Sequence, residues 1–106
     1  MDPNAVRAEF EKLANEAQML RNRVAQLEAE EREHIVAAEV LDSLNGERQC
    51  YRLVGDVLVE KSRDEALMSV RSNMERIQKQ IGLDTNRSLE IEKEVKAVAA
   101  KTRASA

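Results

Sequence analysis

The fold is decided by residues 50–61, which read CYRLVGDVLVEK. The stretch is rich in valine and leucine and too short for a third long helix, and β-branched residues at this density favour a strand. Gly55 and Asp56 divide it, and glycine as the first of two turn residues suits a type II′ turn, where that position needs a positive φ. The sequence therefore predicts a β-hairpin over residues 50–61.

The predicted hairpin carries apolar side chains on both faces, because successive residues of a strand point to opposite sides of a sheet. The two-residue turn sets Val54 opposite Val57 and Leu53 opposite Leu58. An isolated hairpin is marginally stable in water, so we expect this one to join similar hairpins of other chains in a sheet or barrel. The residues expected to serve this assembly are Cys50, Tyr51, Leu53, Val54, Gly55, Val57, Leu58 and Val59.

A heptad pattern precedes the hairpin, with apolar residues at alternating steps of four and three, which is typical of a coiled coil. Asp2-Pro3 supplies an N-cap and a first-turn proline, and Asn45-Gly46 offers a left-handed stop, so we predict a helix over residues 4–46. Its seam consists of Val6, Phe10, Leu13, Ala17, Leu20, Val24, Leu27, Glu31, His34, Ala38 and Leu41.

A second heptad segment follows the hairpin. Ser62 and Glu65 match a capping box, so we predict a helix over residues 62–103. Gly82 lies within it and predicts a locally loosened segment, because glycine costs a helix about 1 kcal/mol relative to alanine. Polar residues in the seam are expected to set register or loosen packing rather than carry chemistry. The seam consists of Leu67, Val70, Met74, Ile77, Ile81, Asp84, Ser88, Ile91, Val95 and Val98.

The length of 106 residues favours one structural unit spanning residues 1–106. Phe10 and Tyr51 are the only aromatic residues, so filler for a compact globular core is scarce. Residues 1–46 carry 10 acidic and 5 basic side chains, net −5, whereas residues 63–106 carry 7 acidic and 9 basic, net +2, which favours pairing of the two helices. The predicted fold class is mainly α: an antiparallel two-helix coiled coil joined by a central β-hairpin.

Composition also argues against several functions. The net charge of −3 lacks the basic excess of a nucleic-acid-binding protein, and no apolar run is long enough to span a membrane. No secretory signal is visible and Cys50 is the single cysteine, which fits a cytoplasmic location. His34 is the single histidine, and we interpret it as a seam residue rather than a metal ligand. We expect no enzyme activity, cofactor or metal site.

The stretch from Cys50 to Glu60, set between two long heptad helices and followed by Lys61-Ser62 at a helix entry, resembles the β-type subunits of the prefoldin family. Asp56 departs from the pattern, since this subunit type more often has a second glycine there. The resemblance implies a heterohexamer of α-type and β-type subunits whose hairpins form a double β-barrel and whose coiled coils project around a cavity. It also implies ATP-independent capture of unfolded proteins, notably actin and tubulin, and their delivery to a cytosolic group II chaperonin.

The free ends of the helices are the predicted client-binding sites, because terminal turns fray and expose seam residues. The candidate residues there are Val6, Phe10, Leu13, Val95 and Val98. A structural coiled-coil tether or adaptor remains an alternative. A tether would self-associate along its helices, whereas a chaperone subunit would associate with unlike chains through the hairpin.

Overall fold

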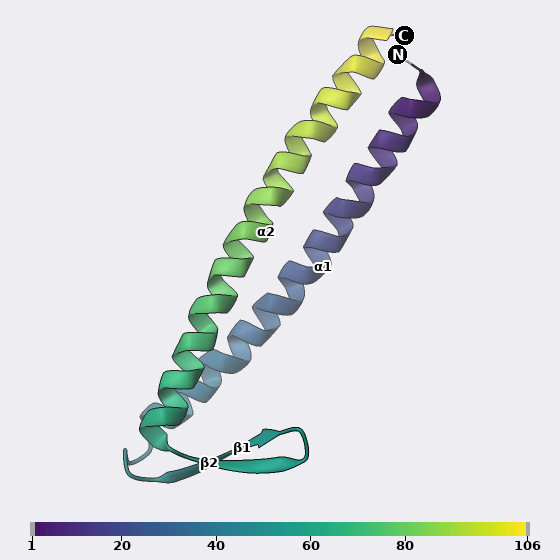
Figure 1. Ribbon diagram of the computed structural model, residues 1–106. Helices are drawn as coiled ribbons and strands as arrows, with labels where there is room; N and C mark the ends of the chain where they lie inside the picture. Colours follow the sequence, from purple (N-terminus) through teal and green to yellow (C-terminus); the bar gives the residue numbers. More distant parts are fainter. Residues whose placement is uncertain (1, 106) are drawn as a thin grey trace. The chain divides into compact units, whose positions relative to one another are not determined.

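The structure, a computed structural model, describes residues 2–105. The order of elements is α1 (Pro3–Asp42), β1 (Gln49–Val54), β2 (Val57–Ser62) and α2 (Arg63–Ser105). Figure 1 shows the two long helices with the hairpin inserted between them in the chain. The expected mainly helical fold with a central hairpin is therefore confirmed. Neither helix, over the residues described, combines the length and apolar character that a bilayer-spanning helix requires.

The start of α1 follows from its first residues. The Asp2 Oδ1 atom accepts a hydrogen bond from the Asn4 amide at 3.1 Å, and the Asp2 carbonyl accepts one from the Val6 amide at 3.1 Å. Pro3 occupies the first helical position, where its missing N–H costs nothing. The predicted N-cap is confirmed.

The end of α1 differs from the prediction. The helix ends at Asp42 instead of continuing to residue 46, and Gly46 has no positive φ. The Ser43 hydroxyl donates to the Val40 carbonyl at 2.6 Å, and the Leu44 amide bonds back to Leu41 in a tighter turn. Asn45 Oδ1 then accepts from the Glu47 amide at 3.0 Å. Short polar side chains thus replace the helical bonds before glycine is reached.

The start of α2 agrees with the prediction within one residue. Ser62 is the last residue of β2, and its hydroxyl accepts a hydrogen bond from the Glu65 amide at 3.2 Å. Asp64 and Glu65 occupy the first turn, where carboxylates complement the helix dipole. The serine half of the capping box is therefore present.

The described residues form two compact units, one of residues 2–27 with 80–105 and the other of residues 28–79. We call the first the end unit, because it contains both chain ends, and the second the hairpin unit. In the end unit, segments of α1 and α2 pack around a buried cluster of Leu13, Leu20, Ile91 and Val98. Val6, Ala17 and Val95 pack against that cluster.

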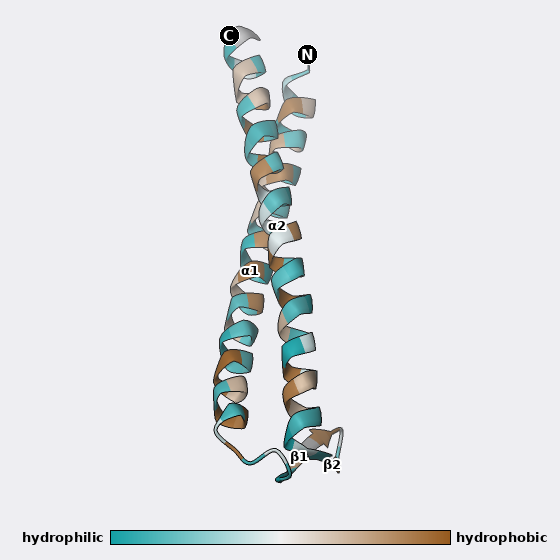
Figure 2. Ribbon diagram, turned by 90° about the vertical axis from the view of Figure 1, so that its left-hand side faces the viewer, coloured by the Kyte–Doolittle hydropathy of each residue, from teal (hydrophilic) through white to brown (hydrophobic). Residues whose placement is uncertain are grey.

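The hairpin unit places Leu67 and Ile77 of α2 in its interior. Asp42 and Arg71 join the two helices across its surface with a 3.2 Å ion pair. Figure 2 shows hydrophobic residues at intervals along each helix and again in the hairpin. Every residue of the two predicted seams is buried or half-buried, except Phe10, which is 46% exposed.

The hairpin has the predicted register. Val54 pairs with Val57 and Leu53 with Leu58 in an antiparallel two-stranded sheet. Gly55 has a φ of +61°, and Asp56 has no positive φ. Because a type I′ turn needs a positive φ at both positions, these angles favour the predicted type II′ turn.

Candidate functional site

The hairpin presents an apolar surface to solvent. Six large side chains on it are between 38% and 65% exposed, and they come from both faces of the sheet. Cys50, by contrast, is half-buried. We call these six residues the hairpin surface: Tyr51, Leu53, Val54, Val57, Leu58 and Val59. Large exposed apolar surfaces are a common feature of interaction sites in proteins.

The sheet also has open edges. Over the part of the chain that the structure describes, β1 pairs with β2 alone, so the outer side of each strand carries backbone groups without a ladder partner. Such edges accept another strand readily, because each added strand satisfies a row of N–H and C=O groups. Open edges and an apolar surface therefore coincide on the hairpin of residues 49–62.

Hydrogen bonds connect α2 to the hairpin and to the residue that precedes it, in addition to the Ser62 cap. The Lys61 ammonium donates to the Ser69 hydroxyl at 3.2 Å, and the Arg63 amide donates to the Arg48 carbonyl at 2.9 Å. Beside the first contact is an open groove of about 570 Å³ within the hairpin unit. Its lining combines the hairpin with both helices and includes His34, Val40, Leu41, Tyr51, Leu53 and Val70. The hairpin is thus positioned by the helices but only partly covered by them.

The five predicted client-binding residues are not equally accessible. Leu13 and Val98 lie in the buried cluster of the end unit, and Val6 and Val95 are half-buried against it. Phe10 is the most exposed of the five. The heptad pattern identified seam residues correctly, but seam residues are the ones that packing hides.

A groove of about 510 Å³ runs beside Phe10 in the end unit. Alanines and a serine at Ala14, Ala17 and Ser88 leave this hollow, and Val95 lines it too. Leu89 also lines it and is 52% exposed, although the sequence analysis did not select it. Leu89 could have been identified from the sequence, because it is a large apolar residue that lies outside the seam, on a side of the helix that is otherwise polar.

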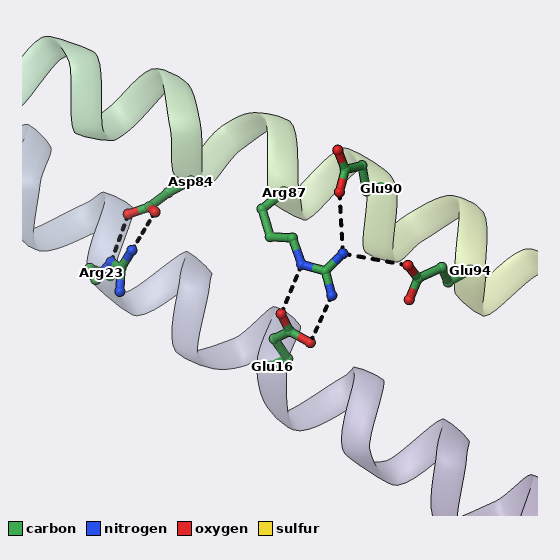
Figure 3. Close-up of polar contacts among 6 residues, drawn as sticks. All are labelled: Glu16, Arg23, Asp84, Arg87, Glu90 and Glu94. Atoms are coloured by element: carbon green, nitrogen blue, oxygen red, sulfur yellow. Dashed lines mark hydrogen bonds and ion pairs between the residues drawn. The ribbon is translucent and has the colours of Figure 1, made fainter.

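The end unit also contains an ion pair between a buried carboxylate and a half-exposed arginine, which Figure 3 shows. Asp84 is 3% exposed, and Arg23 donates to both of its carboxylate oxygens, at 2.5 and 2.7 Å. Gln80 donates a third hydrogen bond at 2.9 Å. Arg23 is the main cause of a lowered pKa of Asp84, and burial opposes it. The sequence placed Asp84 in the seam, where a polar residue is expected to set register or loosen packing, but it did not predict Arg23 as the partner.

A second cluster centres on Arg87, which reaches from α2 to Glu16 of α1 (Figure 3). Its guanidinium donates to the two Glu16 oxygens at 2.9 and 3.2 Å. Glu90 and Glu94 lie 3.2 and 3.4 Å from the same group. The hydrogen bond from Arg87 lowers the pKa of Glu16, and Glu16 and Glu90 raise the pKa of Arg87.

The single histidine has a structural contact. Nδ1 of His34 donates to the Glu30 carbonyl one turn earlier at 2.8 Å. Among the described residues, no three His, Cys, Asp or Glu side chains are grouped as a metal site would require.

Comparison with known proteins gives a family. A model described as prefoldin subunit matches residues 4–105. The chain belongs to the prefoldin subunit family. It is 40% identical over 72 residues to prefoldin subunit 2 of Homo sapiens, covering 68% of this chain and 47% of that protein. It is 36% identical over 86 residues to probable prefoldin subunit 2 of Drosophila melanogaster, covering 81% and 60%. The chain thus spans about half the length of the mammalian relative.

Solved prefoldin structures share the fold. The prefoldin beta subunit from Thermococcus strain KS-1 matches with a TM-score of 0.86 at 17% identity, covering 98% of this chain and 93% of that one. The beta2 subunit from the same source matches with a TM-score of 0.74 at 29% identity, covering 85% and 96%. The resemblance of the hairpin to β-type prefoldin subunits is therefore confirmed.

Proposed function

We propose that this chain is a β-type subunit of a hexameric prefoldin chaperone and that it joins α-type and β-type subunits through the hairpin surface. The observation that carries the proposal is the hairpin, which exposes six large apolar side chains beside two open strand edges. Ordering such a segment costs conformational entropy, and burial of its apolar side chains offsets that cost only when neighbouring strands cover them. In this proposal the whole chain acts as one prefoldin unit.

The assembled complex captures unfolded proteins such as actin and tubulin without ATP and delivers them to a cytosolic group II chaperonin. Family membership supports this role and a cytoplasmic location. It also supports the proposal that the chain has no enzyme activity and needs no cofactor. On this chain the client site is the groove beside Phe10 and Leu89, because a client needs apolar surface that water already reaches. Val6, Leu13, Val95 and Val98 contribute when the helix ends fray. Several weak sites around one cavity give avidity while each stays releasable.

A tether or adaptor is the second candidate. The paired helices favour it, since a coiled coil alone can link two bodies. The two functions differ in which surface holds partners: a tether associates along its helices, and a prefoldin subunit associates through residues 50–61.

The deciding experiment mixes the chain with α-type prefoldin subunits and measures the mass of the product by native mass spectrometry. We expect the native chain to form a hetero-oligomer. The double variant Leu53→Asn with Leu58→Asn should abolish it, because this cross-strand pair is 65% exposed at both positions. Leu83→Asn is the matched control, since Leu83 is 63% exposed on α2. Assembly that survives the hairpin double variant, or a homodimer indifferent to it, favours the tether.

A further inference from the structure

The Arg23–Asp84 pair is unusual because it places a carboxylate in a helix seam that is otherwise largely apolar. Asp84 is 3% exposed, whereas Arg23 reaches it from the edge of α1 with a half-exposed side chain. A buried carboxylate without a cation is strongly unfavourable, so its energy depends on what α1 presents opposite it. That dependence makes the pair sensitive to how α2 is aligned along α1.

The heptad repeat shows what Asp84 would meet in other alignments. Arg23 directly precedes the seam residue Val24, and the equivalent positions one heptad away on either side are Glu16 and Glu30. The opposite edge of the seam gives the same result. Arg21 occupies that edge in the observed alignment, and one heptad away stand Ala14 and Glu28. A slip of one heptad in either direction therefore takes Arg23 away from Asp84 and leaves no cation of α1 at either of these two edge positions.

We propose that Asp84 is a register selector, a buried carboxylate that is paired with a cation of α1 only when α2 lies at its observed alignment on α1. The leucines of the seam do not make this choice, because Leu13, Leu20 and Leu27 recur at heptad spacing and are interchangeable in a slipped seam. Arg87 adds a one-sided preference. One slip brings it from Glu16 to Arg23, a like charge, and the other brings it to Glu9. Asp84 opposes both slips.

The chain has room for the slips that Asp84 opposes. Seven helical residues correspond to about 10 Å. Six residues, 43–48, lie between α1 and β1 outside the regular elements and can extend to about 20 Å. The selector therefore matters within one chain.

The test separates register from stability by reversing the pair. Arg23→Glu with Asp84→Arg keeps an ion pair in the observed alignment. It also leaves an acid at all three equivalent positions of α1, namely 16, 23 and 30, so the buried arginine is satisfied in several alignments. Asp84→Leu is the second variant, in which the buried carboxylate is absent and only the one-sided preference of Arg87 remains. The control is Asp42→Arg with Arg71→Asp, which reverses an exposed pair.

The readout is electron–electron distance spectroscopy on the full-length chain, with spin labels at Ala8→Cys and Asn86→Cys and with Cys50→Ser. Both label sites are exposed and staggered along the helix axis, so the two slips lengthen or shorten the distance. We expect one distance in the native sequence and in the control, and added distances in the reversed pair and in Asp84→Leu. A single unchanged distance in both of these variants overturns the proposal.

Discussion

At the scale of single residues, two glycines show why local conformation matters more than free space. A Cβ atom added at Gly55 or at Gly82 would meet no other atom within 4 Å. Gly55, however, has a φ of +61°, whereas Gly82 lies inside α2 with helical geometry. The same substitution therefore has opposite consequences at the two positions.

We predict that Gly55→Ala destabilises the hairpin by about 1–2 kcal/mol, because the left-handed region strains a Cβ. Gly82→Ala should stabilise the chain by about 1 kcal/mol through helix propensity. Thermal unfolding followed by circular dichroism of the assembled protein measures both. Equal shifts of the two midpoints would contradict the assignment of the strain to φ.

The acid sensitivity of the end unit also belongs to single residues. Arg23 holds the pKa of Asp84 below its ordinary value of 3.8, and Arg87 holds the pKa of Glu16 below 4.5. Groups with a lowered folded pKa stabilise the fold above their unfolded pKa and lose that effect as the pH falls through the folded value. We therefore expect a urea midpoint that is constant from about pH 7 to 5 and falls below about pH 4.

Asp84→Asn tests this assignment. The variant should have a lower midpoint at pH 7, because Arg23 loses its carboxylate, and a shallower fall below pH 4, because one titrating group is gone. A variant whose midpoint falls with acid as steeply as that of the native chain would exclude Asp84 as a source of the acid sensitivity.

At the scale of elements, the strand-to-helix junction at Ser62 combines two roles. Ser62 pairs with Gln49 at the end of the ladder, and its hydroxyl caps α2. We predict that Ser62→Ala lowers stability by about 1 kcal/mol, the usual effect of losing an N-cap. Ser72→Ala, at an exposed position within α2, is the control and should change stability little. Urea titration measures the stability of both variants, and an equal loss of stability in the two would contradict a capping role for Ser62.

Elements governed by local chemistry were predictable from the sequence. The hairpin register followed from one glycine and the alternation around it, and the start of α2 from Ser62. The end of α1 was not predicted, because Ser43 and Asn45 form backbone contacts that compete with the helix before Gly46. From the sequence we expected Gly46 to end the helix. The hydrogen bonds of Ser43 and Asn45, which end it earlier, can be seen only in the folded chain.

The candidate sites were predictable in part for a related reason. Heptad spacing reports which residues face a neighbouring helix, so it found Leu13 and Val98, which are buried. It does not report which seam residue stays accessible, as Phe10 does, or that Leu89 lies beside it. Nor does it pair Asp84 with Arg23, since the contact joins a seam residue to one at the seam's edge, 61 residues apart.

At the scale of the whole molecule, the proposed function assigns client capture and subunit assembly to different residues, so the two can be tested separately. We predict that Phe10→Ser with Leu89→Ser weakens suppression of aggregation by the assembled complex, by a factor of a few, because the groove loses its two exposed apolar side chains. Light scattering of a chemically unfolded client measures the effect, and native mass spectrometry checks that assembly is intact.

Leu13→Ser is the informative comparison for that experiment. Leu13 is 6% exposed, so the substitution should lower stability by several kcal/mol rather than act on clients directly. Unchanged aggregation suppression by the Phe10 and Leu89 variant, with the complex intact, would place client binding elsewhere on the chain.

The open edges of the hairpin have a consequence for protein supply. If the chain assembles through its hairpin as proposed, a copy made in surplus keeps open strand edges and exposed apolar side chains in solution, a combination that promotes aggregation. We therefore expect its synthesis to be matched to that of its partners, or the surplus copies to be degraded.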